Sequence, residues 1–282
     1  MIWSFRPAHR FDLEKRGMVM GVINITPDSF SDGGVFLDPG RAVARGVEMI
    51  SAGADMIDVG GQSTRPGAED VPLKEELRRV LPVVRGLRET LPDCLVSIDT
   101  MKAEVARAAL AEGAVVVNDV SGLTADPDMV AVVRDGGCGV VVMHMRGVPA
   151  TMQEDPRYGD VVAEVGGWLR GRCAELVRAG ISREAMVFDP GIGFGKTRRH
   201  NLELLAALDD LAPPGRPLLL GVSRKSVIAG TLGTRDLPLL DHATVALTAQ
   251  ARLGGACVFR VHEVEPNVRA LRMAEAVTPR RR

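Results

Sequence analysis

Short apolar runs and longer helical stretches alternate along almost the whole chain. Eight runs rich in β-branched residues each end in a polar or glycine-rich break, and they cover residues 19–25, 56–60, 95–99, 115–120, 140–145, 186–189, 218–222 and 257–261. Because these runs are almost continuously apolar, we expect each to be a strand buried on both faces. Such burial is typical of a parallel sheet covered by helices.

A helical stretch is expected after each strand. These stretches cover residues 39–52, 74–91, 102–112, 127–135, 161–179, 201–211, 225–253 and 265–276, and the seventh is split around residues 230–241. Alternation of strand and helix through eight units predicts the α/β class and a (β/α)8 TIM barrel. A doubly wound open sheet is the alternative, but it more often has a phosphate-binding glycine fingerprint after its first strand, which Gly33 and Gly34 do not match.

The barrel is expected to form a single domain over residues 18–277. Residues 1–17 are amphipathic and predict a short hairpin-like extension that closes the lower end of the barrel, with its tryptophan and phenylalanines in the seal. Residues 278–282 end in three arginines, and we expect a disordered tail there.

The composition narrows the function classes. The 282 residues carry a formal net charge of −1, so no bulk electrostatic attraction to nucleic acid or to an anionic membrane is expected. The four cysteines are scattered without zinc-ligand spacing, and we expect reduced, buried thiols. The sequence begins without the apolar core of a signal peptide, and no run is apolar enough to span a bilayer. We therefore expect a cytoplasmic protein.

Polar residues follow every expected strand. In (β/α)8 barrels the catalytic groups lie at these carboxyl ends and face one pocket. The ends carry Asn24 and the loop that follows it, the turn 60–67, Asp99, Asn118 with Asp119, Met143 with His144, the segment 189–196, Ser223 with Lys225, and Arg260 with His262. Each residue alone would serve as a helix cap, but capping gives no reason for Lys225, Arg260 and His262. The set as a whole therefore indicates a ligand site.

Two kinds of chemistry are present in this set. Lys225, Arg260 and His262, together with Thr64 and Ser223, suit a dianionic or pyrophosphate group.

The second kind is a deep group of acceptors. Asp99, Asn118 and Asp189 are expected above an apolar floor at Met143, and buried carboxylates need donors to offset their desolvation. A flat heterocycle rich in N–H groups supplies such donors. Lys225 would donate to its carbonyl or ring nitrogen, and the planar guanidinium of Arg260 would stack on it.

These residues resemble a known family. Residues 24–34, 60–67, 97–100, 118–122, 189–196, 223–225 and 260–262 together resemble dihydropteroate synthase, in the same order and from residue 18 to the last helix. The resemblance implies condensation of 6-hydroxymethyl-7,8-dihydropterin pyrophosphate with 4-aminobenzoate, giving 7,8-dihydropteroate and pyrophosphate in folate biosynthesis. It also implies a transferase that is a sulfonamide target and a homodimer formed through late helices.

The resemblance implies residue roles as well. The pterin would be held by Asp99, Asn118, Met143, Asp189, Lys225 and Arg260, and the pyrophosphate by Thr64, Ser223, Arg260 and His262. The aminobenzoate would lie among Phe30, Arg65, Pro66, Phe194, Lys225 and Ser226. Asn24 would help to coordinate Mg²⁺ on the leaving group, and Asp28 would stabilise cationic character on the pterin methylene if pyrophosphate departs before the amine attacks. No nucleophile–base pair suited to covalent catalysis is expected.

Several positions depart from the family pattern or carry a structural interpretation. Gln62 stands where Glu is more common, and Glu263 where Asp is more common; we expect small effects from both. His144 is interpreted as a structural histidine, and His9 and His200 as surface residues.

Two rival functions remain open. A pterin-binding methyltransferase acting with a corrinoid protein would share the barrel and the pterin-holding residues, but it has no use for the pyrophosphate cluster. A non-catalytic paralogue acting as a binding or scaffold protein is expected to have lost at least one of Asn24, Asp99, Asp189, Lys225 and His262, and all five are present.

Overall fold

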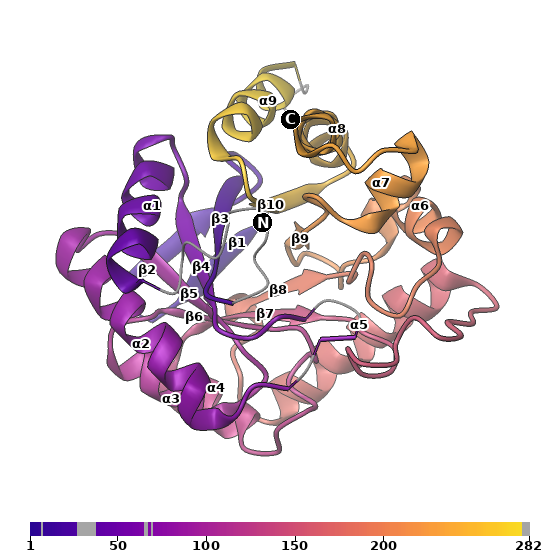
Figure 1. Cartoon of the computed structure of the whole chain (residues 1–282). Helices are drawn as coiled ribbons and strands as arrows, with labels where there is room; N and C mark the ends of the chain where they lie inside the picture. The colour runs from indigo at the N-terminus through magenta and orange to yellow at the C-terminus, as the bar shows by residue number, and fades with distance from the viewer. Residues whose placement is uncertain (7, 27–37, 65–66, 69, 278–282) are drawn as a thin grey trace.

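Eight parallel strands close into one barrel, and helices surround it (Figure 1). The computed structural model describes residues 1–6, 8–26, 38–64, 67–68 and 70–277. Around the barrel the strands are hydrogen-bonded in the order β10-β3-β4-β5-β6-β7-β8-β9, so the last strand closes onto the first. The predicted (β/α)8 barrel is confirmed, and the open-sheet alternative is wrong.

The barrel strands lie within one or two residues of their expected positions. They are β3 (Met18–Asn24), β4 (Met56–Gly60), β5 (Leu95–Asp99), β6 (Val116–Asp119), β7 (Gly139–Met143), β8 (Met186–Asp189), β9 (Leu218–Leu220) and β10 (Ala256–Val261). Continuous apolar runs located these strands, because a strand buried on both faces is apolar along nearly its whole length.

The helices are α1 (Pro39–Ser51), α2 (Leu73–Thr90), α3 (Ala103–Ala111), α4 (Met129–Gly136), α5 (Val161–Arg178), α6 (Arg198–Ala206), α7 (Ser226–Leu232), α8 (Leu237–Leu253) and α9 (Val264–Val277). The expected split of the seventh stretch is confirmed: Gly233 ends α7 with φ +68°, and Pro238 lies in the first turn of α8.

The helix expected at 201–211 is wrong at both ends. It begins at Arg198, because Thr197 caps it: the Thr197 hydroxyl accepts from the His200 amide at 3.2 Å, and the His200 ring accepts from the Thr197 amide at 3.2 Å. A histidine in place of the usual acidic residue hides this capping box from a sequence search. After Ala206 the chain continues as a short 3₁₀ helix, η4 (Leu208–Asp210).

Alternation of side chains along each strand creates two cores. One lies between the strands and the helices and contains Val96 and Ile98 of β5. The other fills the barrel interior and contains Leu95 of the same strand together with Met20 and Val258. Because side chains alternate in direction, Ser97 and Asp99 share the interior face with Leu95.

An antiparallel hairpin closes the amino-terminal end of the barrel. It consists of β1 (Ile2–Phe5) and β2 (His9–Asp12). Trp3 is fully buried, and its indole nitrogen donates to Ala185 O at 2.8 Å. A methyl group at Gly139 would lie 2.9 Å from both Trp3 and Phe5, so the hairpin packs directly against the base of β7. The expected hairpin is confirmed.

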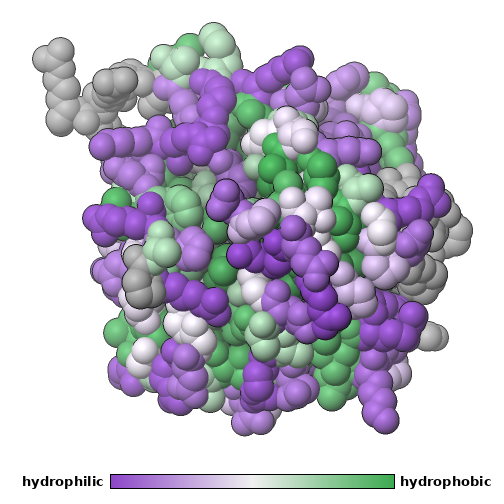
Figure 2. All heavy atoms as spheres, turned by 90° about the vertical axis from the view of Figure 1, so that its left-hand side faces the viewer, coloured by the Kyte–Doolittle hydropathy of each residue, from purple (hydrophilic) through white to green (hydrophobic). Residues whose placement is uncertain are grey.

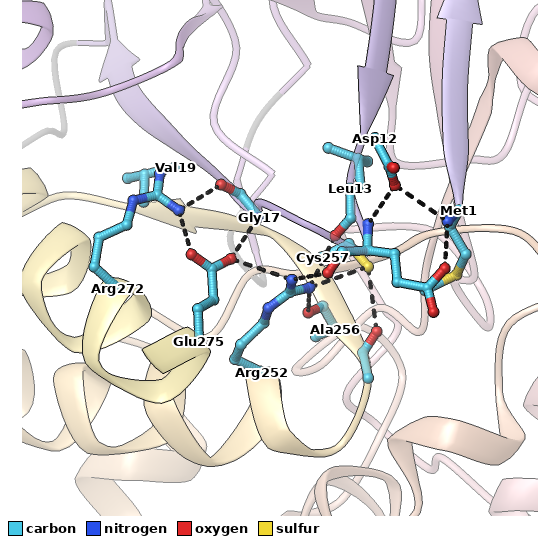
Figure 3. Close-up of polar contacts among 12 residues, drawn as sticks. Met1, Asp12, Leu13, Gly17, Val19, Arg252, Ala256, Cys257, Arg272 and Glu275 are labelled. Carbon is cyan, nitrogen blue, oxygen red and sulfur yellow. Dashed lines mark hydrogen bonds and ion pairs between the residues drawn. The ribbon is translucent and has the colours of Figure 1, made fainter. Parts of the chain in front are cut away.

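Charged side chains of α8 and α9 hold the segment that leads into β3 (Figure 3). Glu275 accepts from the Gly17 amide at 2.5 Å and pairs with Arg272 at 2.6 Å. Arg252 donates to Leu13 O at 3.0 Å and pairs with Glu275 at 3.1 Å. These contacts fasten the start of the first barrel strand to the last two helices, at the seam where the barrel closes.

The surface mixes hydrophilic and apolar side chains. Hydrophilic side chains cover much of the face shown in Figure 2, with apolar side chains between them. All four cysteines are buried and unpaired, as expected. Within the described residues, no helix combines the length and the apolar character needed to cross a membrane.

Replacing Glu275 with alanine tests the contacts at the seam. We expect the free energy of unfolding to fall by about 2–3 kcal/mol, because the Gly17 amide and the Arg252 guanidinium lose a partly buried acceptor. Urea unfolding at neutral pH measures this. Glu265 is the matched control, since it lies on the same helix and pairs with Arg269 but is exposed; Glu265→Ala should cost less than about 1 kcal/mol. Equal losses in the two variants would contradict the assignment.

Candidate active site

The carboxyl ends of the strands bring the expected polar residues to one rim. Across the ladder, Asn24 lies opposite Gly60, Gly60 opposite Asp99, and Asp99 opposite Asn118. Met143 of β7 lies opposite Asp189 of β8 in the same way. Parallel pairing therefore places residues that are far apart in sequence on neighbouring strands at the same height.

A guanidinium group crosses the barrel interior beneath this rim. Arg260 Nη2 donates to Asp99 Oδ2 at 2.7 Å, and Arg260 Nε donates to Asp58 Oδ2 at 2.6 Å. Asn118 Nδ2 donates to the same Asp58 oxygen at 3.0 Å. Three expected site residues are thus brought together around one residue that the sequence analysis missed. The sequence does contain a sign of this residue: Asp58 is a carboxylate within the otherwise apolar strand β4. Burying a carboxylate is costly unless it is paired.

Burial controls the protonation of Asp99. Desolvation raises the pKa of this carboxyl to about 7, although the Arg260 charge opposes the rise. Asp58, Glu76 and Asp119 raise the pKa of Asp99 further by repulsion. The side chain can therefore gain or lose a proton near neutral pH.

Asp189 and Lys225 bring two further opposite charges to the rim, each held by a backbone group. Asp189 Oδ1 accepts from the Gly191 amide at 2.7 Å, and Lys225 Nζ donates to Ile192 O at 2.7 Å. Burial raises the pKa of Asp189 and lowers that of Lys225 to about 8, while the attraction between the two charges opposes both shifts. A methyl group at Gly221 would lie 3.7 Å from both Asp189 Oδ2 and Lys225 Nζ. Glycine at this position leaves open the space that the two groups share.

Ser223 and His262 form a third polar group. The His262 ring nitrogen Nδ1 lies 3.0 Å from Ser223 Oγ, and the His262 amide donates to the same oxygen at 3.3 Å. Between Ser223 and Lys225, Arg224 has φ +58° and pairs with Asp241 and Glu263 at 2.8 and 2.9 Å. The longer Glu263 therefore serves as a partner of Arg224.

The glycine-rich segment after β8 packs against the backbone after β7. A methyl group at Gly191, where φ is +69°, would lie 1.9 Å from His144 O. Lys196 is almost fully buried, and its Nζ lies 3.0 Å from His144 Nδ1, Gly191 O and Phe194 O. Burial lowers the pKa of His144 to about 3, so its ring is neutral and can accept from Lys196. These contacts agree with a structural role for this histidine.

The loop after β4 is tied to the start of α3. Gln62 Oε1 accepts from Lys102 Nζ, which also pairs with the buried Glu76 at 2.7 Å. Thr100 Oγ1 donates to Glu76 at 2.6 Å. The amide at position 62 thus keeps the acceptor that a glutamate would offer. Thr64 lies half-buried on this loop.

The remaining expected residues divide into two groups. The Phe194 ring centroid lies 4.7 Å from Lys225 Nζ, and Ser226 is the exposed first residue of α7. Asp28, Phe30, Arg65 and Pro66 lie outside the described residues, as do residues 278–282.

The model of the family described as pterin binding enzyme matches residues 20–262. A dihydropteroate synthase of Synechocystis is 45% identical over 95% of this chain and 92% of its own length. A crystal structure of Yersinia pestis dihydropteroate synthase with a sulfonamide drug has a TM-score of 0.92 at 39% identity, covering 98% of both chains. A Xanthomonas albilineans dihydropteroate synthase with 4-aminobenzoic acid has a TM-score of 0.87 at 42% identity, covering 96% of both chains.

The carboxyl carbon of Asp99 is expected to titrate near pH 7 in ¹³C NMR of the protein without ligand, and Asp99→Asn identifies its signal. The folded pKa exceeds the ordinary value of 3.8, so the folded state holds a proton that the unfolded state releases. This group's contribution to stability therefore falls as pH rises from about 4 to about 7. Asp135 is the control, because the exposed Arg134 lowers its pKa. An Asp99 signal that titrates with the ordinary value would refute the expectation.

Proposed function

The chain belongs to the pterin binding enzyme family, and from this premise we propose that it acts as a dihydropteroate synthase. It condenses 6-hydroxymethyl-7,8-dihydropterin pyrophosphate with 4-aminobenzoate to give 7,8-dihydropteroate and pyrophosphate. The observation that carries this proposal is the set of buried Asp99, Asn118 and Asp189 with the half-buried Lys225 at one barrel rim. It occurs in a chain that is 45% identical to a curated dihydropteroate synthase over 95% of this chain.

The pterin is recognised by groups that complement its edge. Asp99, Asn118 and Asp189 accept hydrogen bonds from the ring amine and ring N–H groups, which offset the burial of the two carboxylates. Lys225 donates to the ring carbonyl or a ring nitrogen. The half-buried guanidinium of Arg260 and the buried Met143 side chain pack against the faces of the ring.

The pyrophosphate is received next to the pterin. The Ser223–His262 pair and Arg260 supply hydrogen-bond donors and positive charge, and Thr64 contributes a hydroxyl from the loop after β4. This arrangement stabilises the negative charge that develops on the departing group.

A magnesium ion fits this arrangement as a companion of the substrate. Among the described residues, no group of three or more His, Cys, Asp or Glu side chains is placed to hold a metal. Mg²⁺ in phosphoryl sites commonly takes one or two protein oxygens and completes its shell with phosphates and water. Asn24 supplies one such oxygen, and a methyl group at Gly60 would lie only 3.5 Å from it, so glycine keeps the space beside it open. When bound, the ion neutralises charge on the leaving pyrophosphate.

Pyrophosphate leaves first, and the amine of 4-aminobenzoate then attacks the pterin methylene. Because this amine is already nucleophilic, no strong general base is needed. The contact of 4.7 Å between Lys225 and Phe194 supports an aminobenzoate site beside the pterin, with Ser226 at its edge. Phe30, Arg65 and Pro66 complete this site, and Asp28 stabilises positive charge on the methylene in an SN1-like step.

The late helices form a homodimer interface in this proposal. Large apolar side chains are exposed on α7, α8 and α9, namely Leu232, Leu239, Leu253, Met273 and Val277. Burying such side chains against a second copy removes apolar area from water. We also propose that the protein is cytoplasmic.

An assay with the pterin pyrophosphate, 4-aminobenzoate and Mg²⁺ tests the reaction. We expect equal amounts of pyrophosphate and 7,8-dihydropteroate, and EDTA should suppress both. Lys225→Ala should lower kcat/KM at least about 100-fold, because a cation shared by both substrates is lost. Lys74 is exposed on α2, and Lys74→Ala should retain normal activity. Failure of the wild-type chain to form product would refute the proposal, and methyl transfer from methyltetrahydrofolate would favour the rival enzyme.

Calorimetry tests the order of binding. We expect 4-aminobenzoate to bind at least about tenfold more tightly when pyrophosphate and Mg²⁺ are present. Phe30, Arg65 and Pro66 of the proposed aminobenzoate site belong to the same two loops as Asn24 and Thr64. His262→Ala should remove this enhancement, whereas Lys74→Ala should keep it. Equally tight binding to the protein alone would contradict the order.

A further inference from the structure

Asp58 has no place among the proposed substrate contacts, yet it anchors two of them. Its side chain is fully buried on β4, two residues before the rim. In the ladder it lies opposite Val22 on one side and Ser97 on the other, one layer below Gly60. A carboxylate at this depth sits beneath the pocket and forms part of its support.

One oxygen of Asp58 receives both donors. Oδ2 accepts from Arg260 Nε at 2.6 Å and from Asn118 Nδ2 at 3.0 Å. The other oxygen, Oδ1, is buried without a hydrogen-bond partner among the described residues, and so is the hydroxyl of the neighbouring Ser97. Within the described part of the chain, the hydrogen bonds of this carboxylate therefore come from two residues of the pterin site.

Each of these bonds fixes an orientation. A guanidinium is planar, so anchoring Arg260 Nε on Asp58 and Nη2 on Asp99 sets the plane of the group. An asparagine amide can present either its oxygen or its nitrogen. Because Asp58 accepts from Nδ2, Asn118 is held with Oδ1 as the acceptor that it offers to a ligand.

The pairing of Arg260 with Asp58 also affects Asp99. Two carboxylates share this guanidinium, and one of them, Asp99, is itself a proposed pterin acceptor. Without Asp58 the whole charge would rest on Asp99, and the pterin would have to compete with Arg260 for that carboxylate.

We propose that Asp58 is a positioning residue of the pterin site, which holds Arg260 and Asn118 in their ligand-ready orientations and leaves Asp99 able to accept from the pterin. The identity of the substrate in this proposal rests on the proposed function, whereas the contacts of Asp58 do not. Asp58 acts through its neighbours and makes no contact with the reacting atoms.

Three variants separate this role from a general structural one. Asp58→Ala removes the acceptor, whereas Asp58→Asn keeps the shape and one oxygen that can still accept from both donors. Ser97→Ala is the matched control. It truncates the buried side chain opposite Asp58, and the Ser97 hydroxyl has no hydrogen-bond partner within the described part of the chain.

Steady-state kinetics give the first readout. We expect Asp58→Ala to raise KM for the pterin pyrophosphate about 10- to 100-fold and to change KM for 4-aminobenzoate less than about threefold. Asp58→Asn should recover a substantial part of the loss, and Ser97→Ala should behave as wild type. If Asp58→Ala does not fold, Asp58→Asn is compared alone and should still raise the pterin KM selectively. An unchanged pterin KM, or equal rises in both KM values, would overturn the proposal.

Arginine side-chain NMR gives a readout that needs no substrate. The Arg260 Nε–H signal, identified by its loss in Arg260→Lys, should be protected from solvent exchange in the wild type and in Ser97→Ala. It should be shifted in Asp58→Asn and exchange-broadened in Asp58→Ala. An Arg260 signal that is the same in all of these proteins would refute the anchor even if the enzyme were active. Conversely, a wild-type chain with the protected signal but without product would refute the proposed reaction and leave the anchor standing.

Discussion

The site depends on one interaction inside the barrel: the Arg260 guanidinium binds two carboxylates. A buried charge is tolerated only when it is paired and hydrogen-bonded, and Asp58 and Asp99 satisfy Arg260 from two neighbouring strands. Asn118 also donates to Asp58, so this carboxylate binds two residues of the site. The floor of the pocket is therefore already organised before any substrate arrives.

The amino-terminal end of the barrel stabilises the fold, and the carboxyl end carries the polar residues of the site. At the amino-terminal end the interior is apolar and is sealed by Trp3 and the hairpin, and the seam between β10 and β3 is held by Glu275 and its arginine partners. At the carboxyl end the interior becomes polar. Burial there raises the pKa of Asp99 and lowers the pKa of Lys225. A rigid base lets the rim carry charges that on their own would destabilise the fold.

Much of this could be predicted from the chain. Strands β3–β10 followed from apolar runs, and Asp99, Asn118 and Asp189 followed from their places at strand ends. The start of α6 could not, because a Thr197–His200 capping box has no common signature. A carboxylate within the apolar strand β4 marked Asp58 as unusual, but its partner could not be predicted, because Arg260 is 202 residues away in sequence and adjacent only in space.

The sequence by itself determined the barrel, because apolar strands and helical stretches alternate visibly along the chain. It also determined which residue types reach the rim, because these residues directly follow the strands. Only the tertiary structure decided which charges meet. Arg260 extends across the interior to Asp58 and Asp99, Lys225 to Ile192 O, and His262 to Ser223. These choices depend on strand register and on the reach of long side chains across a closed barrel, which no pattern along the chain encodes.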